Sequence, residues 1–131
     1  MIKLIKRKTG NPYSKKPQYA PRWTSKGTVT EFDLATIMAR GSTFSVGEVG
    51  GIMIDFPQYI CDALLSGQSV RIRGLGTFKL KVSGKAKEDP NDVTTEGLKV
   101  SVVFTPDKGL TTRLNYESKF EFVEKSTAKD K

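Results

Sequence analysis

The sequence contains no histidine and only one cysteine among its 131 residues. Without histidine it lacks the usual general base, the commonest metal ligand and any Ser–His or Cys–His nucleophile pair. The lone Cys61 cannot form an intramolecular disulfide, which favours a reducing compartment. The carboxylates are scattered and form no paired catalytic motif. We therefore expect no enzymatic activity, metal, cofactor or small-molecule substrate.

Long apolar runs are also absent. No stretch approaches the roughly 18 residues that a membrane span needs. At the N-terminus, the cations between Lys3 and Lys8 interrupt the segment that would be apolar in a secretory signal. We expect no membrane partner and a cytoplasmic location.

Negatively charged residues are missing from the first 29 residues of the chain. The net charge is +8, and residues 1–29 hold eight of the 22 cations but no acid, so the remaining 14 cations balance all 14 acids. Such a segment is either a solubilising tail or a surface for a polyanion, and nucleic acid fits better than a membrane.

Three aromatic residues lie among these N-terminal cations: Tyr13, Tyr19 and Trp23. Aromatic side chains between lysines and arginines can stack on bases. They can equally hold a loop against the core, and the sequence leaves both readings open.

Two helices are predicted in the first half of the chain. Thr30 is a candidate N-cap for a helix that ends at Gly41. Ser45–Glu48 matches a capping box for a second helix, which Gly67 would end. Pro57 lies inside this second helix and is expected to kink it.

The most informative segment is Ser69–Lys87, which holds six cations and no acid. It begins as an alternating strand up to Arg73, breaks at Gly74-Leu75-Gly76 and resumes as a second alternating strand, Thr77–Ser83. The alternation places apolar residues on one face and cations on the other. This pattern indicates a sheet that lies against something negatively charged.

Further elements are predicted on both sides of this segment. The polar stretch Gly84–Gly97 is expected to be an arm between the second strand and an antiparallel third strand, Leu98–Thr105. Met1–Lys8 and Phe120–Val123 are expected to be terminal strands that pair with each other. Thr9–Pro21 contains turn and breaker residues and is expected to be a loop.

Gly74-Leu75-Gly76-Thr77-Phe78 resembles the glycine-x-glycine-threonine-phenylalanine signature of the bacterial HU/integration-host-factor DNA-binding proteins. The helical pattern upstream fits the same family. Phe104–Leu110 resembles the family's segment that leads into its last helix, which is expected here over Asp107–Asn115. The resemblance covers roughly Thr30–Leu114, and residues 1–29 look like an extension that ordinary members lack.

The resemblance implies a dimer in which two helices per subunit carry a β-saddle, and two β-arms reach around DNA. Backbone amides at the saddle turn can meet phosphates, and the lysines and arginines would neutralise them and release counterions. For any one lysine, the alternative is a solvated side chain. The residues expected to contact DNA are Arg71, Arg73, Gly74, Gly76, Thr77, Lys79, Lys81, Lys85, Lys87, Lys99 and Lys108.

The arm departs from the family's pattern. Family arms carry arginines and an Arg-Asn-Pro turn whose proline wedges between base pairs, whereas here Pro90 precedes Asn91. The arm also carries acids that would repel phosphates, which argues against insertion of Pro90 and against strong bending. These acids are Glu88, Asp89, Asp92 and Glu96.

We predict an α+β, HU-like fold that forms an intertwined homodimer: a helical pair, a three-stranded antiparallel sheet with a β-arm, a short last helix and extra terminal strands. The expected domains are a basic extension at 1–29, an HU-like DNA-binding domain at 30–125 and a disordered tail at 126–131. The predicted function is non-enzymatic, largely sequence-independent binding of double-stranded DNA, as an architectural protein of the nucleoid. The alternatives are RNA binding and an HU-like structural module that no longer binds DNA.

Overall fold

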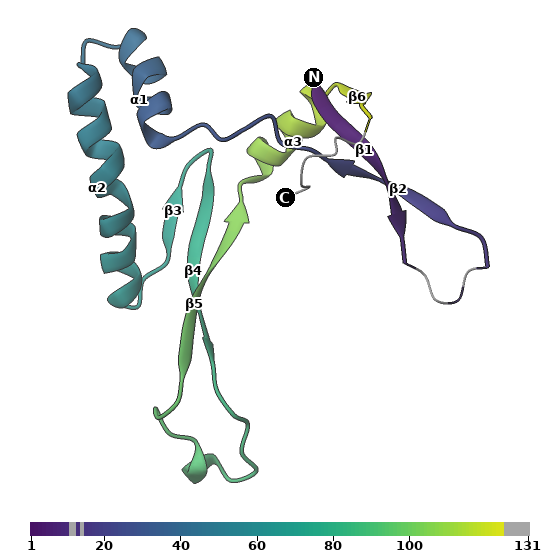
Figure 1. Ribbon diagram of the computed structural model, residues 1–131. Helices are drawn as coiled ribbons and strands as arrows, with labels where there is room; N and C mark the ends of the chain where they lie inside the picture. Colours follow the sequence, from purple (N-terminus) through teal and green to yellow (C-terminus); the bar gives the residue numbers. More distant parts are fainter. Residues whose placement is uncertain (11–12, 14, 125–131) are drawn as a thin grey trace. The chain divides into compact units, whose positions relative to one another are not determined.

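The computed structural model describes residues 1–10, 13 and 15–124 (Figure 1). The chain divides into two compact units, and each contains one three-stranded sheet. One unit joins residues 1–30 to the chain from Leu114 onward, and the other spans Glu31–Arg113. The first unit therefore combines the predicted basic extension with the last strand. The predicted tail at 126–131 lies outside the described residues.

The predicted helical pair is confirmed as α1 (Glu31–Arg40) and α2 (Val46–Leu65). The capping box at the start of α2 is formed: the Glu48 N–H donates to Ser45 Oγ, and the Ser45 N–H donates to Glu48 Oε1, each at 3.1 Å. These bonds from the backbone and side chain of Ser45 lower the pKa of Glu48. Gly67, at a φ of +82°, follows the end of the helix. The helix continues through Pro57, and the predicted kink there stays a prediction.

Close packing of α1 on α2 depends on small residues. Ala35 of α1 is completely buried, and a Cβ added to Gly50 of α2 would lie 3.9 Å from the Ala35 Cβ. Val49 and Leu64 of α2 are also buried. Large apolar side chains elsewhere on the pair stay exposed, and Phe32 and Ile52 are among them. One copy of the chain therefore buries little of its helical apolar surface.

The three predicted central strands are confirmed as β3 (Val70–Ile72), β4 (Gly76–Ser83) and β5 (Lys99–Pro106). They form an antiparallel sheet in the order β3-β4-β5, and the arm joins β4 to β5. The last predicted helix is α3 (Lys108–Glu117), close to the expected bounds.

The terminal strands also pair as expected. β1 (Ile2–Thr9) lies between β6 (Phe120–Phe122), to which it is parallel, and β2 (Gln18–Trp23), to which it is antiparallel. The prediction of a loop over Thr9–Pro21 is wrong at both ends, because Thr9 belongs to β1 and Gln18 to Pro21 belong to β2. The breaker signals up to Pro17 lie before β2, and Pro21 is tolerated within it because β2 is an edge strand, where a residue without an N–H is allowed.

Candidate nucleic-acid interface

The register of the β3-β4-β5 sheet gathers cations on one face. Lys79, Lys81 and Ser83 of β4 lie opposite Val103, Ser101 and Lys99 of β5, and Arg71 of β3 lies opposite Thr77. Because side chains alternate along a strand and paired residues share a face, all four cations lie on the same side. The three strands contain no acid. We call this surface the cationic face, defined by Arg71, Thr77, Lys79, Lys81 and Lys99.

The opposite face of the same sheet is apolar. Phe78 and Phe104 are cross-strand partners whose ring centroids are 4.9 Å apart, tilted by 44°. Leu80 and Val82 continue this face along β4 toward the arm and are partly exposed. The alternation therefore separates charge from apolar surface, as the sequence predicts.

The turn between β3 and β4 is held from within the chain. The Gly74 N–H donates to Asp107 Oδ2 at 2.8 Å, and an Arg71 guanidinium nitrogen lies 3.6 Å from Asp107 Oδ1. The Asp107 N–H in turn donates to the Leu75 carbonyl. The amide that the resemblance assigns to a phosphate thus has a carboxylate partner already.

The second glycine of the signature is required by packing. A Cβ on Gly76 would lie 2.4 Å from the Thr105 carbonyl oxygen and 2.7 Å from the Phe104 ring. Gly76 also has a φ of +154°, and Gly74 has a φ of +84°. Any side chain would clash at Gly76 and would strain the backbone at both glycines. The glycines of the signature therefore build the turn, whatever the chain binds.

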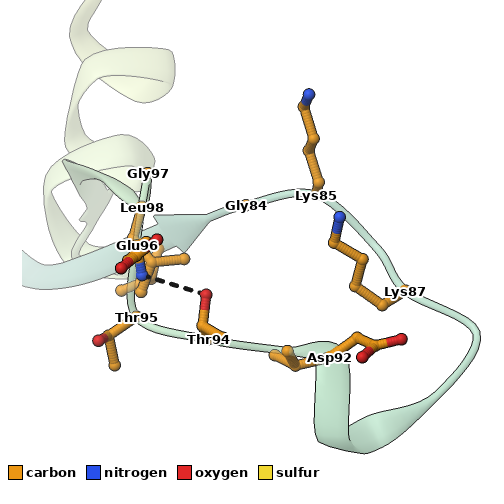
Figure 2. Close-up of a pocket in the computed structure, with 11 residues that line it drawn as sticks. Gly84, Lys85, Lys87, Asp92, Thr94, Thr95, Glu96, Gly97 and Leu98 are labelled. Carbon is orange, nitrogen blue, oxygen red and sulfur yellow. Dashed lines mark hydrogen bonds between the residues drawn. The ribbon is translucent and has the colours of Figure 1, made fainter.

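Both arm lysines lie on the loop between β4 and β5. In Figure 2 the side chain of Lys85 points away from the loop, whereas that of Lys87 lies across its opening. Asp92 and Glu96 line the same pocket, which has a volume of about 890 Å³. This mixture of signs makes the arm far less basic than the cationic face.

The tip of the arm is a single turn of 3₁₀ helix over Pro90–Asp92. Asp89 caps it, since Asp89 Oδ1 accepts a bond from the Asn91 N–H at 3.0 Å. Pro90 thus occupies the first position of a capped helical turn, where a fixed φ suits it. This local structure gives Pro90 a role that needs no contact with DNA.

The structure brings together five of the eleven predicted residues on the cationic face. Arg73, Gly74 and Gly76 follow at the adjoining turn, where Arg73 is exposed. Lys85 and Lys87 lie on the arm, and Lys108 is the first residue of α3. The predicted set is therefore a sheet face with two outlying groups.

The candidate stacking residues that the sequence pattern does not single out are two phenylalanines, Phe120 and Phe122 of β6. They share a sheet with Tyr19 and Trp23, for which the sequence offers stacking as one of two readings and which lie on strand β2. The alternation of large side chains at Tyr19, Pro21 and Trp23 is the signal that could have shown a strand. The prolines concealed it, because they are more often found in loops.

Neither a metal-ion cluster nor a membrane-spanning helix occurs among the described residues. Across residues 1–10, 13 and 15–124, no group of three or more acidic or cysteine side chains could hold a metal ion. Within the same ranges, none of the helices has the length and apolar character to cross a bilayer.

A family model with the description "HU domain fused to wHTH, Ig, or glycine-rich motif" matches residues 2–121. The chain belongs to this HU-HIG family. The HU-like resemblance carried by Gly74–Phe78 agrees with this membership. The match also includes most of the N-terminal extension, so the added strands belong to what the family model describes.

The HU-HIG chain is also similar to a solved crystal structure, that of a candidate bacterial DNA-binding protein from Bacteroides vulgatus ATCC 8482. The two share 14% sequence identity and a TM-score of 0.67 over 97% of this chain and 50% of the other. The chain therefore spans half the length of that protein, and at this identity the similarity concerns the fold alone. None of the curated proteins matches the chain significantly.

Proposed function

We propose that this HU-HIG chain binds double-stranded DNA without catalysis and largely without regard to base sequence, as an architectural protein of the nucleoid. The observation that carries the proposal is the cationic face: four cations share one side of a three-stranded sheet whose strands contain no acid. Membership of an HU family supports the same function, and a solved protein of similar fold is described as a candidate DNA-binding protein.

The chemistry of the cationic face suits phosphates better than bases. Lys79 and Lys81 are two residues apart on one strand, so their attachment points lie about 7 Å apart. The side chains between the cations are small, mostly hydroxyl-bearing, and none is aromatic. Phosphate contacts position a protein on DNA without reading its sequence. This explains why we propose little base preference.

The three lysines of the cationic face carry most of the proposed contacts. Within the part of the chain that the structure describes, none of Lys79, Lys81 and Lys99 forms an ion pair. Arg71, in contrast, already lies beside the Asp107 carboxylate. A phosphate therefore meets the lysines without first displacing an internal partner, and Arg73, Gly74, Gly76 and Lys108 are proposed at the edge of the same interface.

The arm is proposed as a weaker contact. Lys85 and Lys87 would meet phosphates, but four acids on the same loop oppose them, and Pro90 belongs to a capped helical turn. We infer that the arm bends DNA less than a proline wedge would.

The proposed binding form is a homodimer. The helical pair exposes Phe32, Ile37 and Ile52 to more than half of their full area, and the apolar face of β5 exposes Val100 and Val102 similarly. A protein that works as a monomer rarely leaves so many large apolar side chains uncovered. A second copy that covers it would also place two cationic faces on one DNA molecule.

A duplex titration across ionic strength tests the proposal. Affinity for a mixed-sequence duplex should fall steeply as the salt concentration rises. In a plot of log affinity against log salt concentration, the downward slope should be about 0.9 for every phosphate neutralised. Lys79→Gln with Lys81→Gln removes four lysines from a dimer, so it should reduce the slope by about 4 and weaken binding to all sequences alike.

The matched control removes two cations elsewhere, Arg40→Gln with Lys119→Gln, and should leave the slope nearly unchanged. A flat salt titration, or equal losses in both double variants, would contradict the proposal. Tenfold tighter binding of single-stranded RNA than of duplex would favour the alternative of an RNA-binding protein.

A further inference from the structure

A second surface with ligand-binding character lies on the β2-β1-β6 sheet (Figure 1). The register pairs Leu4 of β1 with Trp23 of β2 on one side and with Phe122 of β6 on the other, so these residues share a face. The side chains two positions away along each strand share it as well. We call it the aromatic face, defined by Lys6, Lys8, Tyr19, Trp23, Phe120 and Phe122.

The aromatic face is exposed although its residues are apolar. Tyr19 and Trp23 expose 64% and 65% of their area, and Phe120 and Phe122 expose 58% and 55%. Ile5, which points to the opposite face of the same sheet, exposes only 3%. The sheet therefore packs with one side, and the side with the aromatic rings is the other one.

Cations stand among these rings. The Lys6 ammonium lies 5.2 Å from the centroid of the Phe122 ring, and Lys8 is the cross-strand partner of Tyr19. The three strands contain a single acid, Glu121, which lies on the opposite face and 3.9 Å from Lys3. The aromatic face thus offers flat rings and positive charge with no negative charge.

We propose that the aromatic face binds single-stranded DNA, with bases stacked on the rings and phosphates beside Lys6 and Lys8. Unpaired nucleotides supply both groups that this face complements, a planar base and a negative phosphate. In a duplex the base faces are covered by their neighbours, so this ligand differs from that of the cationic face. The choice of DNA rests on the proposed function.

A second copy of the chain fits this face less well. In a twofold interface the same patch meets itself, so Lys6 and Lys8 would approach their own counterparts. No acid of these strands lies on this side to neutralise them. The charge pattern therefore favours a polyanion over self-association.

The single tryptophan of the chain allows a direct test, because Trp23 lies on the aromatic face. Titration of the full chain with oligo(dT) should quench its fluorescence. Phe122→Ala should weaken binding of oligo(dT) about tenfold, the loss typical of one stacked base. The control is Tyr116→Ala, which removes an even more exposed ring from α3 and should leave the affinity unchanged.

Two further measurements distinguish this proposal from the proposal of duplex binding. The double variant Lys79→Gln with Lys81→Gln should lose affinity for duplex DNA but should still show fluorescence quenching by oligo(dT). The proposals for the two faces can therefore be contradicted independently. Absence of quenching, or equal affinities of Phe122→Ala and Tyr116→Ala, would overturn the proposal. Tenfold tighter binding of oligo(rU), or a change of oligomeric state on Phe122→Ala in sedimentation, would overturn the choice of single-stranded DNA.

Discussion

The two three-stranded sheets of this chain use lysine differently. In β3-β4-β5, alternation sends the cations to one face and all the apolar side chains except Val103 to the other. In β2-β1-β6, Lys6 and Lys8 share their face with Tyr19, Trp23 and two phenylalanines. A face of cations and small polar residues suits a phosphate backbone, whereas cations among aromatic rings suit exposed bases. Lysines on two strands can therefore indicate different ligands, depending on which side chains lie on the same face of the sheet.

The sheets also differ in support. The helix α2 packs along β3 and β4, and the β3–β4 turn is held by Asp107. The β2-β1-β6 sheet depends on joining the two ends of the chain, since β6 is about 110 residues from β1. Variants that affect one sheet and spare the other therefore test the comparison.

The largest effect is expected from Gly76→Ala, which should destabilise the β3-β4-β5 sheet. The new Cβ would lie 2.4 Å from a backbone carbonyl oxygen at a strained φ, so we expect a loss of about 3 kcal/mol in the free energy of unfolding. Urea denaturation followed by circular dichroism measures it. Gly109→Ala, on α3 with open space around it, is the control and should be neutral or slightly stabilising. Equal stability of the two variants would show that packing does not require Gly76.

Charge reversal on the cationic face comes next. Lys79→Glu with Lys81→Glu should weaken duplex binding by about tenfold or more, because two phosphate contacts become repulsive. The same variant should bind oligo(dT) within about threefold of the parent. Anisotropy titrations with labelled duplex and oligo(dT) measure both. Parallel losses for the two ligands would mean that one surface binds both.

Loss of the α2 N-cap tests the support of the first sheet. Ser45→Ala removes the acceptor of the Glu48 N–H bond and should lower the free energy of unfolding by about 1 kcal/mol. Thermal or urea denaturation measures it, with Ser45→Asp as the variant that retains a cap. If Ser45→Ala were as stable as the parent, the capping box would contribute nothing to this fold.

A smaller effect is expected from Lys6→Gln on the aromatic face. The salt slope of oligo(dT) binding should fall by about 0.7, the value for one phosphate of a single strand, while the duplex slope stays constant. Lys3→Gln, on the opposite face of β1 beside Glu121, is the control. An equal change in both variants would mean that the face of β1 does not matter.

The smallest effect concerns pH. The pKa of Glu48 is lowered in the folded chain by the Ser45 N–H and the Ser45 side chain. Its contribution to stability is therefore present above the ordinary pKa of 4.5 and is lost as the pH falls through the lowered value. The stability difference between the parent and Glu48→Gln should shrink over this range in denaturation curves. A constant difference down to the acid limit would contradict the assignment.

Much of the fold could be predicted because the decisive patterns are local. The capping box at Ser45, the helical spacing after it and the alternation of β4 each depend on residues within one or two turns of one another. The shared face of Lys79 and Lys81 follows from the same alternation, whereas Gly74, Gly76, Thr77 and Lys108 were expected from the family resemblance. Strand β2 escaped prediction because the turn and breaker residues up to Pro17 indicate a loop, and a strand that contains Pro21 is possible only at the edge of a sheet.

The local sequence pattern was thus sufficient for the helices and for every strand except β2, for the separation of charge on β4 and for the HU-like signature. Only the tertiary structure decided the contacts between distant segments. Asp107 accepts a hydrogen bond from the Gly74 N–H, and β6 lies beside β1 so that the Lys6 ammonium lies near the Phe122 ring. Such partners are set by the register of strands far apart in the chain, which no local pattern encodes. For the same reason, local sequence does not show that position 76 must be glycine. The requirement arises because β5 packs so closely against this position that a Cβ has no room.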